Sequence, residues 1–144
     1  MINENTLLNL IDKVKYTTIS YIDSDGYPVS KAMLAPREHD GLHTFWFSTN
    51  TSSNKVQQFK QNPKASIYFI DQRFFRGISL SGTIEVIEDT TEKEKIWRDG
   101  DEMYYSKGIT DPDYCVLKFN AIKGRFYSNF KSKDFSILNR KDIE

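Results

Sequence analysis

One segment of the chain carries the residue types that bind a phosphate group: Ser48-Thr49-Asn50-Thr51-Ser52-Ser53-Asn54-Lys55. Phosphate binds to backbone N–H groups at the start of a helix, to hydroxyl donors and to a cation. The segment lies between an aromatic run and an apolar helical pattern, so these groups would meet at a helix start. A polar loop in which Ser52 or Ser53 only caps the helix explains the same residues equally well. The pattern alone leaves both interpretations open.

A second candidate is a lysine inside an otherwise apolar run, Val29-Ser30-Lys31-Ala32-Met33-Leu34. The ammonium group of Lys31 must either extend into solvent or meet an anion, because an unpaired charge is costly to bury. From these residues alone, an outward-facing lysine on a solvated sheet surface is the favoured interpretation.

Other kinds of chemistry find little support in the sequence. His39 and His43 flank a turn, and no third or fourth metal ligand stands at a familiar spacing. Cys115 is the single cysteine, so an intrachain disulfide is excluded, and its apolar strand pattern predicts a buried structural thiol. No Gly-x-Ser-x-Gly motif is present. The sequence therefore predicts neither a metal site nor a catalytic nucleophile.

The bulk properties narrow the class of protein. The 144 residues fit one domain, residues 1–144, with a core large enough to need no disulfide. Twenty basic residues balance twenty acidic ones, so no net positive charge attracts nucleic acid. No apolar run approaches the ~20 residues of a membrane span, and no secretory signal is visible. We expect a cytoplasmic protein with no membrane or nucleic-acid partner.

The elements that must position the candidate residues are mostly strands. Periodicity predicts an N-terminal helix over residues 4–15, a short helix after Ser53 that ends at Asn62, and a helix over 91–98 with a capping-box spacing. Six or seven strands are expected, at residues 16–23, 27–35, 42–48, 65–71, 78–86, 115–120 and 124–130. Residues 99–113 read as irregular, and Gly82 indicates a bulge or sharp bend. Such short-turned strands favour an antiparallel sheet that curls or closes, while periodicity leaves barrel and sandwich open.

The order and distance of the two candidate segments resemble the pyridoxamine 5'-phosphate oxidase-like family of flavin-binding split barrels. The resemblance covers about residues 6–130. It includes the strand start Lys31-Ala32-Met33-Leu34, the segment Ser48–Lys55, the helix end Asn62-Pro63-Lys64-Ala65 and the strand Arg76–Val86. Within that family, the general stress protein branch is most similar, on four features: Ile96-Trp97, Tyr104-Tyr105, Asp111-Pro112-Asp113-Tyr114 and Cys115–Phe119.

The resemblance implies a fold and a cofactor. The fold would be mainly β with a few helices: a six-stranded antiparallel split β-barrel with an N-terminal helix and short helices between strands. The cofactor would be FMN or FAD, bound across the interface of a homodimer. The residues that would touch it are Lys31, Ala32, Met33, Leu34, Ser48, Thr49, Ser53, Asn54, Lys55, Gly77 and Tyr127. Of these, Thr49, Ser53 and Lys55 would hold the phosphate, and Tyr127 would come from the second subunit.

The chain also departs from the family pattern at named positions. Asn54 stands where an arginine would touch the flavin phosphate, and Gly77 replaces a glutamine that would meet the flavin ring. Tyr127 takes the place of a tryptophan, while Lys133 and Phe135 stand near the substrate-binding arginine and histidine of the true oxidases. The resemblance therefore implies altered flavin binding and argues against oxidation of pyridoxamine 5'-phosphate.

The sequence supports a flavin-dependent oxidoreductase with an unassigned small-molecule substrate, with a possible role in stress. One alternative is a non-catalytic dimer that binds or senses flavin or another flat cofactor. Another is a structural homodimer with an empty cleft, which the replacements at Asn54 and Gly77 would favour.

Overall fold

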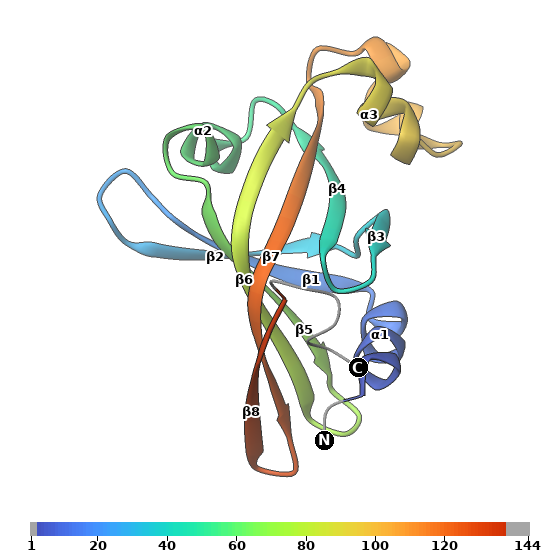
Figure 1. Cartoon of the computed structure of the whole chain (residues 1–144). Helices are drawn as coiled ribbons and strands as arrows, with labels where there is room; N and C mark the ends of the chain where they lie inside the picture. Colours follow the sequence, from blue (N-terminus) through green and yellow to red (C-terminus); the bar gives the residue numbers. More distant parts are fainter. Residues whose placement is uncertain (1–2, 138–144) are drawn as a thin grey trace.

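The structure is a computed structural model that describes residues 3–137 of the chain. Figure 1 shows long strands crossing the molecule, with helices around them. In chain order the elements are α1 (Glu4–Lys13), β1 (Tyr16–Ile22), β2 (Pro28–Leu34), β3 (Glu38–Asp40), β4 (Thr44–Asn50), α2 (Asn54–Gln61), β5 (Lys64–Asp71), β6 (Arg76–Ile87), α3 (Thr90–Ile96), the 3₁₀ turns η1 (Asp101–Met103) and η2 (Gly108–Thr110), β7 (Tyr114–Ser128) and β8 (Lys131–Ser136).

The strands form one antiparallel sheet in the order β2-β1-β5-β6-β7-β4-β3, and β8 pairs with the free side of β7. This is the mainly antiparallel split-barrel class that the sequence predicted, although the described residues contain eight strands where six were expected. The two additional short strands are β3 and β8, which are only three and six residues long. They lie at the margins of the sheet. Strand β3 is too short to show an alternation, and β8 is mostly exposed, so its sequence shows no buried face.

A bulge explains one wrong prediction, the break between two strands at residues 121–123. The structure has a single strand there, β7, of 15 residues. The pairing of β6 with β7 shifts register where Ser81 faces Lys123 and Gly82 faces Ala121, so that Ile122 has no partner on β6. The extra residue interrupts the alternation of buried and exposed side chains in β7, and the sequence therefore appeared to contain two strands. The bend expected at Gly82 is confirmed at the same place.

Close packing explains why Gly82 is needed at the bulge. A Cβ atom on Gly82 would collide with the backbone carbonyl of Asn120 on the neighbouring strand. No side chain fits there without moving backbone, so the glycine lets β6 and β7 stay paired through the bend.

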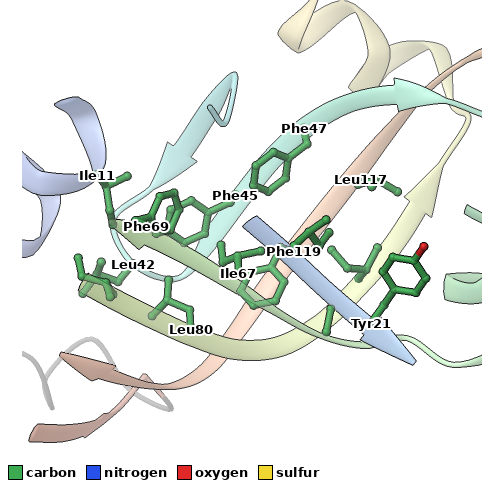
Figure 2. Packing of buried hydrophobic residues seen from close by; sticks show 14 of the residues in the cluster. Ile11, Tyr21, Leu42, Phe45, Phe47, Ile67, Phe69, Leu80, Leu117 and Phe119 are labelled. Carbon is green, nitrogen blue, oxygen red and sulfur yellow. The ribbon is translucent and has the colours of Figure 1, made fainter. Parts of the chain in front are cut away.

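Most apolar faces of the helices and strands meet in one large core (Figure 2), and Trp46, Ile96 and Val116 form a second, smaller cluster. Alternate residues of β4 and β5 are fully buried, among them Phe45, Phe47 and Phe69. The helical stripe predicted for α1 is confirmed, since Leu7, Leu10 and Ile11 are buried. This core fixes the faces of β2, β4 and α2 that remain outside it, and those faces carry the candidate site.

The first residues of α1 and α3 show how these two helices begin. The side chain of Asn3 caps α1 by accepting a hydrogen bond from the Asn5 amide at 2.8 Å. The capping-box prediction at residues 91–94 was wrong, because α3 begins at Thr90 and Asp89 holds the N-cap position. The carbonyl of Asp89 accepts from the Lys93 amide at 3.1 Å, so the first turn closes earlier than the sequence indicated.

Candidate functional site

Two strands that are not neighbours in the sheet line one open cleft of ≈ 210 Å³. The sheet curls so that β2, at one end of the strand order, faces β4, near the other end. The start of α2 and the turn around η1 close two further sides. The lining residues are Lys31, Ala32, Met33, Leu34, Ala35, Arg37, Phe47, Ser48, Thr49, Asn50, Lys55, Tyr104 and Tyr105.

Lys55 is a buried cation of this cleft. It lies in the first turn of α2, its residue is only 6% exposed, and its Nζ donates to the Ser53 hydroxyl at 3.3 Å. Burial lowers the pKa of Lys55, and the positive charge of Lys31 lowers it further. Within residues 3–137 neither lysine makes an ion pair with a carboxylate. A buried ammonium group without a counterion is the arrangement that a bound anion would relieve.

The segment before α2 is held by a carboxylate from far along the chain. The Ser52 amide donates to Asp113 Oδ1 at 2.9 Å, and Asn50 Nδ2 donates to Asp113 Oδ2 at 2.8 Å. The Thr51 amide donates to the Asp113 carbonyl at 2.7 Å, and the Ser53 amide donates to the Asn50 carbonyl at 3.1 Å. These bonds engage the amides of residues 51–53. An anion in the cleft would therefore rely on the lysines, the hydroxyl groups and the first amides of α2, which have no acceptor within the helix.

The two hydrogen bonds to its carboxylate, from Asn50 and from the Ser52 amide, lower the pKa of Asp113. The group stays charged at neutral pH and keeps the segment in one shape. The predicted side-chain cap of α2 is not formed, because Ser53 occupies the N-cap position but its hydroxyl accepts from Lys55 instead of a helix amide.

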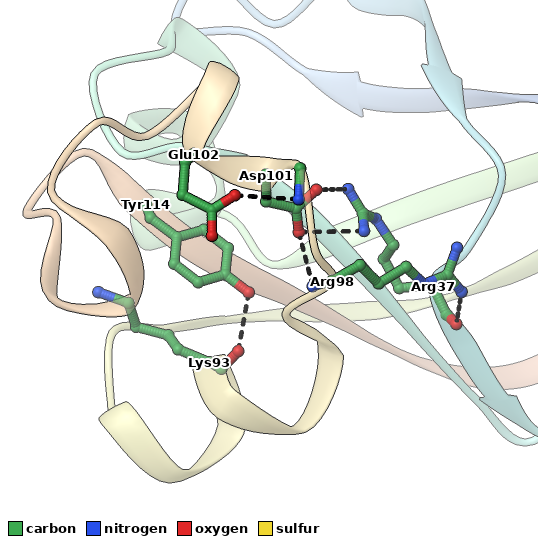
Figure 3. A network of polar contacts seen from close by, with 7 residues as sticks. Arg37, Lys93, Arg98, Asp101, Glu102 and Tyr114 are labelled. Carbon is green, nitrogen blue, oxygen red and sulfur yellow. Dashed lines mark hydrogen bonds and ion pairs between the residues drawn. The ribbon is translucent and has the colours of Figure 1, made fainter.

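The remaining wall of the cleft depends on a second long-range contact, shown in Figure 3. Arg37 donates two hydrogen bonds to Asp101, at 2.8 and 3.1 Å, and their side chains are only 12% and 7% exposed. The Arg98 amide also donates to Asp101, and the Arg98 guanidinium donates to the Arg37 carbonyl at 2.6 Å. This network ties residues 97–113 to the loop after β2.

The tied segment brings two tyrosines to the cleft. Tyr104 is 67% exposed and presents an apolar face, whereas Tyr105 is buried against Tyr114 with 4.8 Å between ring centroids. Burial raises the pKa of Tyr105, so its phenol stays protonated. The wall is therefore aromatic and uncharged next to a floor that carries two cations.

Residues 3–137 contain no group of three His, Cys, Asp or Glu side chains that could hold a metal ion together. His39 lies 2.8 Å from Asp12 Oδ1 and 2.9 Å from the Gly41 carbonyl, so both its ring nitrogens have partners. Cys115 is buried, as predicted. None of the helices in the described part of the chain has the length and apolar character that crossing a bilayer requires.

Comparison with known proteins gives the cleft its context. The sequence profile of pyridoxamine 5'-phosphate oxidase matches residues 5–128. The chain belongs to the pyridoxamine 5'-phosphate oxidase family. Curated relatives include the pyridoxine/pyridoxamine 5'-phosphate oxidases of Caulobacter vibrioides strain NA1000, 35% identical over 50% of this chain and 32% of that protein, and of Legionella pneumophila strain Lens, 25% identical over 98% of this chain and 55% of that protein. The chain thus spans from about a third to about half the length of these relatives.

Solved structures place the chain in the general stress protein branch of the family, as the sequence predicted. A protein from Clostridium acetobutylicum, described as related to general stress protein 26 of B. subtilis, is 42% identical, with a TM-score of 0.85 over 94% of this chain and 97% of that one. General stress protein 26 of Bacillus anthracis strain Sterne is 19% identical, with a TM-score of 0.73 over 90% and 96% of the two chains, and this likeness shows the fold alone.

Seven of the eleven predicted site residues of this family member line the cleft: Lys31, Ala32, Met33, Leu34, Ser48, Thr49 and Lys55. Ser53 is adjacent through its bond to Lys55. Asn54 is exposed at the first position of α2, outside the lining. Gly77 and Tyr127 also lie outside it, and they face each other on β6 and β7.

Tyr68 packs against Gly77, the position at which the resemblance implies a glutamine. A Cβ atom on Gly77 would collide with the hydroxyl of Tyr68, which occupies the space of the missing side chain. Tyr68 also lies near Tyr127, with 6.3 Å between ring centroids. The glycine therefore belongs to a local repacking around a tyrosine pair.

Sequence reasoning missed four residues that shape the cleft: Arg37, Tyr104, Tyr105 and Asp113. The tyrosines and Asp113 lie in segments that the sequence marked as features of the general stress protein branch. That signal could have identified them as site residues, but nothing in their spacing indicated which strand they would meet. Arg37 carried no signal, since its partner Asp101 is 64 positions away.

Proposed function

We propose that this protein binds a flavin nucleotide, FMN or FAD, in the cleft between β2 and β4, and that it acts as a flavin-dependent oxidoreductase on a small molecule. The observation that carries the proposal is the ammonium group of Lys55, buried beside Lys31 with no carboxylate partner among the described residues. Phosphate is the anion that the family's cofactor would bring to this position. The residues present therefore fit the group.

The chain's own residues would divide the work of binding. Lys31 and Lys55 would hold the phosphate by charge, with the hydroxyl groups of Thr49 and Ser53 as donors. Ala32, Met33 and Leu34 would contact the ring through backbone groups and apolar side chains. A bound flavin would supply the electron transfer, and a cation near its polar edge would stabilise the anionic reduced form.

The size of the cleft supports the homodimer that the family resemblance implies. At ≈ 210 Å³ it lies below the roughly 300–1,000 Å³ of sites that enclose a cofactor-sized ligand. Tyr127, which the resemblance assigns to the flavin, lies away from the cleft of its own chain. A second copy of the chain would supply the missing wall. In this proposal residues 1–144 form one flavin-binding domain that works in the cytoplasm.

One observation favours a second candidate function, a flavin-binding or sensing dimer without turnover. The lining of the cleft contains no carboxylate and no histidine. A protein acid or base would therefore have to come from a tyrosine, from a lysine or from a partner subunit.

The test begins with binding. The purified protein is stripped of ligand, titrated with FMN and FAD, and followed by quenching of flavin fluorescence. We expect Lys55→Met to weaken FMN binding by about 1.5–3 kcal/mol, the value of a charge-assisted hydrogen bond. Lys60→Met, on an exposed position of the same helix, is the matched control and should leave the affinity unchanged. Failure of the wild-type protein to bind either flavin would refute the proposal.

A second measurement separates the two functions. The flavin-loaded protein is mixed with reduced nicotinamide nucleotides and then with oxygen or quinones, while the visible flavin bands are followed. Repeated reduction and re-oxidation would establish an oxidoreductase. Bound flavin that no reductant reduces would establish the non-catalytic alternative.

A further inference from the structure

A second cleft lies at the other end of the molecule, between α1 and the hairpin that joins β5 to β6. Its volume is ≈ 410 Å³, about twice that of the cleft proposed for the flavin. The lining residues are Leu10, Lys13, Val14, Lys15, Tyr16, Ile70, Asp71, Gln72, Arg73, Phe74 and Arg76. None of these residues belongs to the first cleft, so this is a separate site.

The charge of the second cleft is strongly unbalanced. Four cations line it and only one carboxylate, although the whole chain carries no net charge. Lys13, Lys15 and Arg73 make no ion pair within the described residues. The nearby carboxylate of Asp12 is already occupied, 2.8 Å from His39 Nε2. The cleft therefore has positive charge that no side chain within residues 3–137 neutralises.

The single carboxylate orders the hairpin and leaves the cleft positive. Asp71 accepts from Arg76 at 2.9 Å and from the Arg73 amide at 3.1 Å. Arg76 then has its Nε buried with no acceptor in the described part of the chain. Asp71 thus neutralises one of the four cations, Arg76, and leaves the other three without an ion pair among the described residues.

Aromatic rings form the other feature of the cleft. Tyr16 is 64% exposed and Phe74 is 57% exposed. The guanidinium groups of Arg73 and Arg76 lie 4.8 and 5.2 Å from the centroid of the Phe74 ring. Phe75, the next residue, has a positive φ of 51°, so the shape of the hairpin is imposed by the fold and is not favoured locally. Ring faces and cations are thus presented together.

We propose that this second cleft binds a mononucleotide-like ligand, a planar ring that carries a phosphate. The exposed ring of Tyr16 and the guanidinium group of Arg73, which lies over Phe74, offer planar faces for stacking, and Leu10, Val14 and Ile70 form an apolar floor. Lys13, Lys15 and Arg73 match a doubly charged anion better than a single carboxylate, since three unpaired cations surround one space. The two clefts share no residue within one chain, so binding at each can be followed separately.

Adenosine 5'-monophosphate is the probe, and amide NMR spectra of the whole chain are the readout. We expect its addition to shift the amides of residues 13–16 and 71–76 while those of residues 31–34 and 48–55 stay in place. Adenosine lacks the phosphate and ribose 5-phosphate lacks the ring, so each should bind at least about tenfold more weakly. Binding should also weaken as salt is raised.

Two variants complete the test. Lys15→Gln with Arg73→Gln removes two exposed cations and should weaken binding of the probe by about tenfold or more. Lys107→Gln, at an exposed position outside both clefts, is the matched control and should leave the binding unchanged. The proposal is overturned if the shifts fall on residues 48–55, if ribose 5-phosphate binds as well as the nucleotide, or if the double variant binds normally.

Discussion

The two clefts each have an arginine–aspartate ion pair at the rim, and the two pairs differ in burial and in reach. Arg37 and Asp101 are 64 positions apart and almost fully buried, whereas Arg76 and Asp71 are five positions apart and 30% and 20% exposed. The first pair joins separate parts of the chain, and the second stabilises one hairpin. The difference indicates that a long-range contact fixes the wall of the cleft between β2 and β4, whereas the pair in the second cleft orders only its hairpin side, the other side being α1.

The largest expected effect comes from breaking the buried pair. Asp101→Asn leaves the Arg37 guanidinium without its counterion and should lower the free energy of unfolding by about 3–5 kcal/mol. Urea unfolding of the variant measures this change. The double variant Arg37→Met with Asp101→Asn should recover part of the loss, because no buried charge remains unpaired. A single variant as stable as the wild type would contradict the comparison.

A smaller effect, a gain in stability instead of a loss, is expected when Lys55 is replaced. Its pKa is lowered in the folded state, mainly by burial, so the native protein binds fewer protons than the unfolded chain. Stability should therefore rise with pH between the lowered folded pKa and the ordinary value. Lys55→Met should raise the stability of the flavin-free protein by roughly 0.5–2 kcal/mol while weakening FMN binding.

To test whether Lys55→Met raises stability while it weakens FMN binding, thermal unfolding without ligand and FMN affinity are measured on the same preparation. Lys60→Met again serves as the control, and it should change neither. If Lys55→Met destabilises the flavin-free protein, its ammonium group is held by the fold and not reserved for an anion.

The next effect is a dependence on pH at Asp113. The bonds from Asn50 and the Ser52 amide lower its pKa, so its contribution to stability is present above the unfolded pKa and is lost as pH falls through the folded one. Asp113→Asn should be less stable than the wild type at neutral pH, and the difference should shrink in acid. Urea midpoints measured across that range test it. A difference that stays constant with pH would mean that the carboxylate charge plays no part.

The smallest effect is expected at Asp71. Asp71→Asn weakens a local, partly exposed ion pair, and such pairs contribute little to stability. Its effect on unfolding should be far below that of Asp101→Asn measured under the same conditions. Equal losses would remove the distinction between the two regions.

The same distinction explains how far the sequence could predict the structure. Strand alternation and short turns predicted the antiparallel class, and the lysine and hydroxyl segments predicted seven residues of the cleft. These signals are local, or they rest on a family resemblance that fixes the distance between segments. Strand β3 has only three residues, and β8 is mostly exposed and polar, so neither shows an alternation of apolar residues. The bulge at Ile122 made one long strand look like two in the sequence.

The residues that could not be predicted are those whose partners lie far along the chain. Asp113 is hydrogen-bonded to Asn50, 63 positions away, and no feature of either segment indicates the other as its partner. Gly77 and Tyr127 were predicted from resemblance, and their positions in one chain do not reach the cleft. Their role stays a prediction that depends on a second subunit.

The hold of Asp113 on the segment before α2 has a consequence for how the protein is made. At the usual synthesis rate of about 5–20 residues per second, Asn50 would leave the ribosome roughly 3–13 seconds before Asp113 follows it. During that time the aromatic strand β4 lacks its partner β7, since the paired residues of β7 begin at Tyr114. The segment Ser48–Lys55 must therefore acquire its shape near the end of translation, and Phe45, Trp46 and Phe47 form an apolar stretch that a chaperone could bind until then.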